Sequence, residues 1–193
     1  MEIIDRIKNI LVTPKTEWVT IDEENAPHMK VFTGYVLPLA AIPAIASFIG
    51  YGIIGYSVLG IHVGGTVSWG IRQAIIQYIT MVGGAYLTAY VINFLAENFG
   101  ARNNLDKAFS LVAYAYTPAF VAGVFYIIPS LSWLASLAGI YSLYLLYIGL
   151  KPLMQSPEEK TTTYFVVSLL VMVAVFMVLG FVLGLMFVSA AFM

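Results

Sequence analysis

Cysteine is absent from this chain, and charge of either sign is scarce. The absence of cysteine excludes disulfides, thiol catalysis and cysteine-ligated metals. Asp, Glu, Lys and Arg together make up 10% of the residues, against roughly 25% in soluble domains. So few charges cannot cover a surface that faces water on all sides. The net charge of −1 offers no general attraction to nucleic acid, so no nucleic-acid partner is expected.

Long apolar runs take the place of the missing charges. Hydrophobic residues make up 61% of the chain, and the mean hydropathy is +0.90. A helix of about 20 apolar residues crosses a hydrocarbon core roughly 30 Å thick. The runs therefore predict an all-α polytopic membrane protein in contact with membrane lipids. An N-terminal segment (1–33) precedes a domain (34–193) with five transmembrane helices at 34–59, 69–95, 108–128, 131–150 and 164–190.

The N-terminal segment begins with an amphipathic pattern. Ile3, Ile7 and Ile10 recur at helical spacing, and Arg6 lies with other polar residues on the opposite face. This pattern predicts a short amphipathic helix that lies in the membrane interface and ends before Pro14.

Breaker residues occur inside the first and second expected spans. Pro38 and Pro43 fall in the first span and predict a kink or break there, because proline removes a helical hydrogen bond. The pair Gly83-Gly84 in the second span also permits a bend.

The placement of lysine and arginine predicts the orientation. Apart from Arg72, these residues lie in the N-terminal segment and in the loops after the second and fourth spans. Positive residues in short loops are retained in the cytoplasm. We therefore expect a protein of the cell membrane with a cytoplasmic N-terminus and an external C-terminus.

Two stretches of the chain resemble a known family. Tyr114 to Pro118 is similar to an aromatic-x-aromatic-Ser/Thr-x-Pro element, and Tyr144 to Pro157 is similar to a Tyr-Leu-Gly-Leu to Pro-Glu-Glu-Lys region. Both elements are found in the Yip family, five-helix membrane proteins first known as interactors of Ypt/Rab GTPases. The resemblance implies a five-span fold. The short N-terminal segment resembles that of the prokaryotic members, for which the resemblance implies little about activity.

No pattern typical of an enzyme is present. The sequence has no Ser-His-Asp order, Gly-rich phosphate loop or metal-helix motif. His28 and His62 are expected on opposite sides of the membrane, so they cannot share a metal. We predict a protein without a catalytic site, metal or cofactor. The Yip resemblance favours a scaffold or adaptor that organises the membrane or binds a cytoplasmic protein partner.

Arg72 is the single charge expected within a span. A guanidinium at mid-membrane costs roughly 2.5–3.5 kcal/mol on insertion scales. Trp69 is typical of the membrane interface and lies three residues before Arg72. The long side chain of Arg72 could therefore extend to the outer headgroups. Alternatively, Arg72 with Gln73 and Gln77 lines a polar pocket for an anionic headgroup or solute. That second interpretation predicts a small channel, carrier or lipid-handling protein.

Hydroxyl groups surround a proline in the third span. Pro118 leaves the carbonyl near Tyr114 without its helical donor. The hydroxyls of Tyr114, Tyr116 and Thr117 could satisfy such freed backbone groups, or they could form a gating kink or contact a substrate.

Two further groups of residues have both a structural and a functional interpretation. Small residues at every fourth position allow close helix packing within the bundle, and in the last span they could instead form a homodimer seam. Acidic residues on the cytoplasmic side could form a surface for a protein partner or an ordinary solvated face. The small residues are Ala115, Ala119, Gly123, Gly180 and Gly184, and the acidic residues are Asp22, Glu23, Glu97, Asp106 and Glu158.

Overall fold

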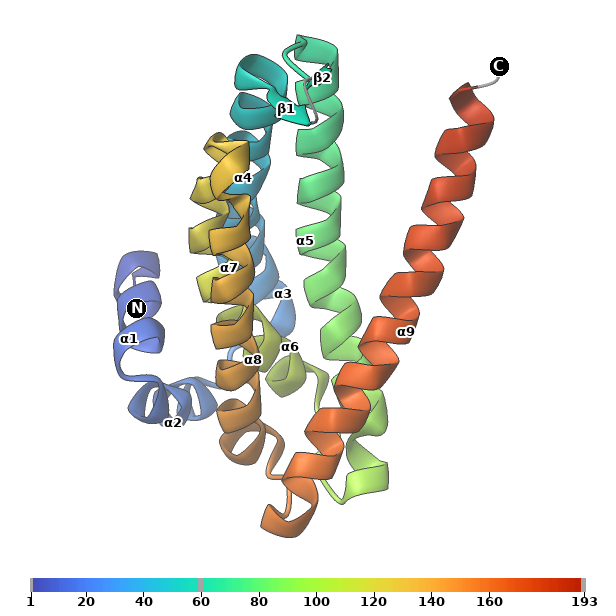
Figure 1. The fold of residues 1–193 in the computed structure, drawn as a ribbon. Helices are drawn as coiled ribbons and strands as arrows, with labels where there is room; N and C mark the ends of the chain where they lie inside the picture. Colours follow the sequence, from blue (N-terminus) through green and yellow to red (C-terminus); the bar gives the residue numbers. More distant parts are fainter. Residues whose placement is uncertain (1, 59–60, 192–193) are drawn as a thin grey trace.

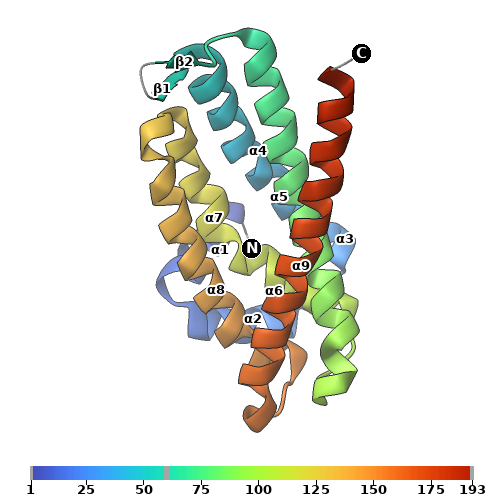
Figure 2. The same cartoon turned by 45° about the vertical axis from the view of Figure 1, so that its right-hand side comes forward.

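Five long helical segments lie roughly along a common axis, and successive segments run in opposite directions (Figures 1 and 2). The computed structural model describes residues 2–58 and 61–191, with side chains placed for 2–57 and 64–177. Within this part of the chain, five helical segments are long and apolar enough to cross a membrane, which confirms the predicted polytopic fold. They are His28–Ile54, Val67–Phe99, Leu105–Ile127, Pro129–Met154 and Glu158–Met177.

The first span combines α-helical and wider π-helical turns. It comprises α3 (His28–Val31), η1 (Phe32–Val36), α4 (Leu37–Ser47) and η2 (Phe48–Ile54). The amide of Leu37 donates to the carbonyl of Phe32, five residues back, directly before Pro38. The predicted disruption at Pro38 therefore takes the form of a π turn before α4, whereas Pro43 lies inside α4, which continues through it.

A short hairpin and one long helix follow. Strands β1 (Tyr56–Val58) and β2 (Ile61–Val63) pair antiparallel, where the sequence predicted the end of the first span and a turn. Helix α5 (Val67–Ala96) is capped by the Thr66 hydroxyl, and it continues without interruption through Gly83-Gly84. The one-turn helix η3 (Glu97–Phe99) ends it.

The third span forms the centre of the bundle and is divided at Tyr116. Helix α6 (Leu105–Ala115) is buried from Lys107 onward, and its N-terminus is capped by the Asn104 side chain. After Tyr116 the chain continues as α7 (Thr117–Ala122) and η4 (Gly123–Ile127). Because Pro118 lies in the first turn of α7, its missing amide hydrogen costs no helical bond there.

The last two spans lie outside this central helix. The one-turn helix η5 (Pro129–Leu131) leads into α8 (Ser132–Met154), and α9 (Glu158–Ala191) returns along the bundle. Helix α9 contacts α5 and α8, and the ring of Phe176 in its middle lies against Gly84 of α5. Towards the C-terminus α9 leans away from the bundle (Figure 1).

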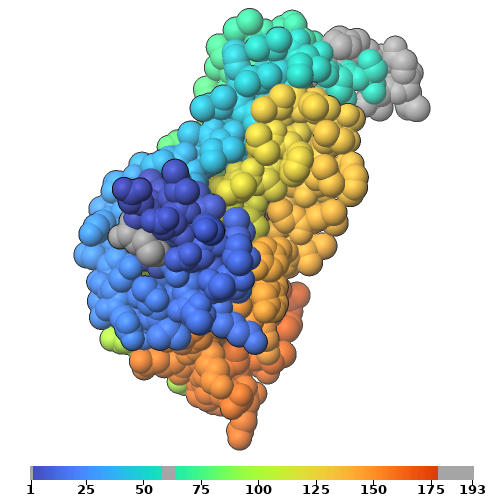
Figure 3. Space-filling model, turned by 90° about the vertical axis from the view of Figure 1, so that its left-hand side faces the viewer, coloured from blue at the N-terminus to red at the C-terminus, as the bar shows by residue number. Residues whose placement is uncertain are grey.

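The N-terminal segment folds onto the bundle. Helix α1 (Ile3–Val12) agrees with the predicted short helix, and α2 (Pro14–Glu24) follows at a sharp angle (Figure 1). Helix α2 is not predicted by the sequence pattern, because it ends in three consecutive acidic residues, Asp22, Glu23 and Glu24. Its inner face buries Trp18 against Gly149 of α8, where an added Cβ would lie 2.8 Å from the indole. Together α1 and α2 cover part of one face of the bundle, between the yellow and the orange segments (Figure 3).

Candidate functional site

A buried arginine lies where the N-terminal helices meet the bundle. Arg6 is 4% exposed, although the sequence pattern assigned it to the polar face of α1, and that assignment is wrong. Its guanidinium donates to Glu17 at 2.5 Å and to Glu24, both on α2. It also lies over the ring of Tyr114 on α6, 5.1 Å from the centroid. Arg6 therefore joins α1, α2 and α6.

The carboxylates keep this arginine charged. Burial by itself lowers the pKa of Arg6, but the hydrogen bond to Glu24 and the nearby charges of Glu24 and Glu17 outweigh that effect and raise the pKa above its usual value. Glu17 is itself 5% exposed, so each charge depends on the other for compensation.

One more ion pair and a pair of hydrogen bonds attach the N-terminal segment to the start of α6. Lys107, 3% exposed, donates to the backbone carbonyl of Asp22 and lies 2.7 Å from its carboxylate. Asp106 accepts from both the backbone amide of His28, at 2.7 Å, and its ring Nδ1, at 2.6 Å. Two carboxylates of the predicted partner surface, Asp22 and Asp106, thus take part in contacts within the chain.

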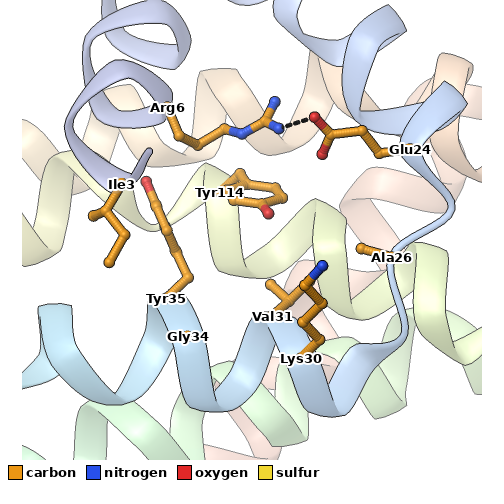
Figure 4. A pocket seen from close by; sticks show the side chains of 9 residues that line it. All are labelled: Ile3, Arg6, Glu24, Ala26, Lys30, Val31, Gly34, Tyr35 and Tyr114. Atoms are coloured by element: carbon orange, nitrogen blue, oxygen red, sulfur yellow. Dashed lines mark hydrogen bonds and ion pairs between the residues drawn. The ribbon is translucent and has the colours of Figure 1, made fainter. Parts of the chain in front are cut away.

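A polar cavity lies beside Arg6. Its volume is about 200 Å³, and residues from α1, the end of α2, the first span and α6 surround it (Figure 4). Its acidic and basic side chains come from Arg6, Glu24 and Lys30, and the rings of Tyr35 and Tyr114 form one wall. The full lining is Ile3, Arg6, Glu24, Ala26, Lys30, Val31, Gly34, Tyr35 and Tyr114.

The hydroxyl groups around Pro118 bond to one another and to the freed backbone. The Thr117 hydroxyl lies 2.7 Å from the Tyr114 carbonyl and 2.7 Å from the Tyr35 hydroxyl. The Tyr116 hydroxyl lies 2.9 Å from that of Thr88 on α5. This network joins the divided third span to its neighbours, and through Tyr114 it adjoins Arg6.

The polar residues of the second span lie far from that network. Arg72 is exposed in the second turn of α5, with its guanidinium 5.8 Å from the Trp69 ring, and Gln73 and Gln77 are partly buried. Sixteen residues separate Arg72 from Thr88 on one continuous helix, a rise of roughly 24 Å. The predicted intramembrane site is therefore divided into a group near the hairpin and a central group.

The remaining predicted acidic residues are exposed at one end of the bundle. Glu97 accepts from Asn103 at 2.8 Å, Glu158 lies 2.9 Å from Lys151, and Glu23 is in the last turn of α2. Among the residues described, no group of three or more His, Asp and Glu side chains is placed to hold a metal ion.

The small residues of the third span serve packing inside the molecule. Ala115 is fully buried, Ala119 is partly buried, and a Cβ at Gly123 would lie 2.4 Å from the Cβ of Pro43. Gly180 and Gly184 are in the part of α9 whose side-chain surroundings lie outside the described residues.

Sequence reasoning missed Arg6, Glu17, Glu24 and Lys107 as a connected set. One signal was available: Arg6 precedes Ile10 by four residues, and residues at that spacing share a helix face. The face that buries Ile10 therefore also carries Arg6. The carboxylate partners on α2 could not be found in this way, because they depend on the angle between the two helices.

Comparison with known proteins gives a consistent result. The model of the Yip1 domain matches residues 8–192. The inner membrane protein YohC of Escherichia coli K12 is 32% identical over 160 residues, covering 78% of this chain and 80% of YohC. YohC of the E. coli O6:H1 strain matches to the same extent. No solved structure gives a significant match.

Proposed function

Because this chain belongs to the Yip1 domain family of membrane proteins, we propose that it is a non-enzymatic membrane scaffold whose polar end binds a cytoplasmic protein. The observation that carries the proposal is the attachment of α1 and α2 to the bundle through Arg6 and Lys107. We infer that these buried ion pairs fix the geometry of the helices that they join, because another angle would leave a buried charge unpaired. The N-terminal helices thus form a rigid surface beside the loops after α5 and α8.

The exposed carboxylates of this surface are suited to recognition. Glu23, Glu97 and Glu158 come from three separate elements at the end of the bundle opposite the hairpin (Figure 1). Exposed charges contribute little to stability but steer association with a partner of opposite charge. We therefore expect a partner with a basic contact surface.

The alternative function, a carrier or channel around Arg72, has less support. Arg72 is exposed beside Trp69 near the hairpin end of α5, the arrangement expected of an arginine that extends towards headgroups. The hydroxyl network at Thr117 lies well away from it and is occupied with backbone and side-chain partners.

Crosslinking in native membranes tests the proposal. The variant Glu23→Lys/Glu97→Lys reverses two exposed charges, whereas the control Glu2→Lys/Asp5→Lys makes the same charge change at the start of α1. We expect wild type and control to crosslink to one reproducible cytoplasmic protein that the first variant loses. Retention of that protein by the first variant, or self-crosslinks alone from wild type, would contradict the proposal.

A further inference from the structure

A second hollow opens where the N-terminal helices meet α8 and the start of α9. Its volume is about 530 Å³, and it lies on the face shown in Figure 3, where the blue and orange segments meet. Its polar lining consists of Lys15, Trp18, Tyr147, Lys151, Glu158 and Thr161. We propose that this hollow binds the phosphate headgroup of an anionic phospholipid in the leaflet that contains the N-terminal helices.

The charge of the lining favours an anion. Two ammonium groups, Lys15 and Lys151, face one carboxylate, Glu158. Within the described part of the chain, the Lys15 ammonium has no hydrogen bond or ion pair. Lys151 pairs with Glu158, but both side chains are well exposed, at 58% and 85%, so the pair is weak and Lys151 can turn to a phosphate.

A buried donor without a partner lies in the same wall. Trp18 is 1% exposed, and its indole Nε1 has no hydrogen-bond partner among the described residues. Buried donors are rarely left unsatisfied, because the loss of hydration is not compensated. Under this proposal a phosphate or ester oxygen supplies the missing acceptor once the indole edge, which is covered in this structure, turns towards the hollow.

An adjoining hollow distinguishes a lipid from a free anion. It has a volume of about 330 Å³, shares Lys15 with the first, and is bordered by Val12 and Tyr144. On α8, Ile140, Tyr144, Tyr147 and Lys151 follow one another at helical spacing on one stripe, and the first three are exposed. An apolar path therefore leads from Lys151 along α8 towards the bilayer interior, as an acyl chain requires and inorganic phosphate does not.

Native mass spectrometry of the full chain in detergent tests this site. Phosphatidylglycerol is titrated into wild type, into Lys15→Gln/Lys151→Gln, and into Lys8→Gln/Lys160→Gln, which removes two exposed lysines outside the hollow. We expect wild type and the Lys8/Lys160 variant to bind with equal Kd and the Lys15/Lys151 variant to bind about tenfold more weakly. Both lysine double variants should keep the wild-type Tm, whereas Trp18→Phe, which shortens a buried ring, should weaken binding several-fold and lower the Tm.

Four results would overturn the proposal. Equal binding of phosphatidylcholine would show that the phosphate charge is not recognised. Equal losses in the two double variants would indicate general attraction instead of a site. Unchanged binding in the Lys15/Lys151 variant would exclude these lysines. Displacement of the lipid by inorganic phosphate at comparable concentration would identify a site for free anions. None of these results depends on the proposed protein partner.

Discussion

At the scale of single residues, Arg6 shows how this protein places a charge inside an apolar structure. An isolated guanidinium would not be stable there, and Glu17 and Glu24 supply the compensating charges from the next helix. Such a buried pair contributes little net stability compared with apolar residues of the same volume. The pair does lower the free energy of one arrangement of α1 and α2 relative to the others, because any other angle between the helices leaves a buried charge unpaired.

Removal of the Arg6 charge should therefore detach the N-terminal helices. In Arg6→Met, Glu17 is left buried without a partner. We expect this change to destabilise the packing of α1 and α2 on the bundle by about 3–5 kcal/mol. Amide hydrogen exchange should accelerate in 3–24, while protection in α8 remains. Lys8→Met, on the exposed side of the same helix, should change little. Equal protection of α1 and α2 in the two variants would show that Arg6 does not hold them.

At the scale of elements, irregular turns allow the helices to approach closely. Gly123 begins η4 directly against Pro43 of α4, and Gly52 of η2 faces Gly70 of α5. A Cβ on either Gly52 or Gly70 would lie 2.6 Å from the Cα of the other. Close backbone contact of this kind replaces the hydrophobic driving force that helices in a bilayer lack.

A methyl group at one of these contacts should separate the helices. A Cβ at Gly123 would lie 2.4 Å from Pro43 Cβ and 2.9 Å from its Cα, so we expect Gly123→Ala to destabilise the bundle by about 1–3 kcal/mol. At Gly83 nothing lies within 4 Å of the added Cβ, and Gly83→Ala should be neutral or gain up to about 1 kcal/mol of helix propensity. Unfolding in mixed micelles with increasing SDS measures both. A Gly123→Ala protein as stable as Gly83→Ala would mean that the η4 to α4 contact is not tight.

At the scale of the whole molecule, the apolar runs determine the architecture, and local chemistry determines its interruptions. The number of spans follows from hydrophobicity, and the division of the third span lies beside Pro118, the residue without an amide hydrogen. The π turn beside Pro38 and the uninterrupted course of α5 through Gly83-Gly84 could not be predicted from the sequence. Neighbouring helices decide whether a bend that a residue permits actually occurs. The ion pairs of Arg6 and Lys107 join residues distant in the chain and need the tertiary arrangement.

The distribution of charge between the two ends of the bundle predicts its orientation in the membrane. Lysine and arginine lie at the end with the N-terminal helices, except Arg72 near the hairpin, so that end should be cytoplasmic.

Because the chain has no cysteine, a single introduced cysteine reports its own side of the membrane without background labelling. Ser130→Cys and Asn103→Cys place exposed thiols at opposite ends, in η5 and in the loop before α6. A membrane-impermeant maleimide should label Ser130→Cys in intact cells and Asn103→Cys after permeabilisation. The reverse pattern would invert the topology and move the acidic surface outside, where a cytoplasmic partner could not reach it.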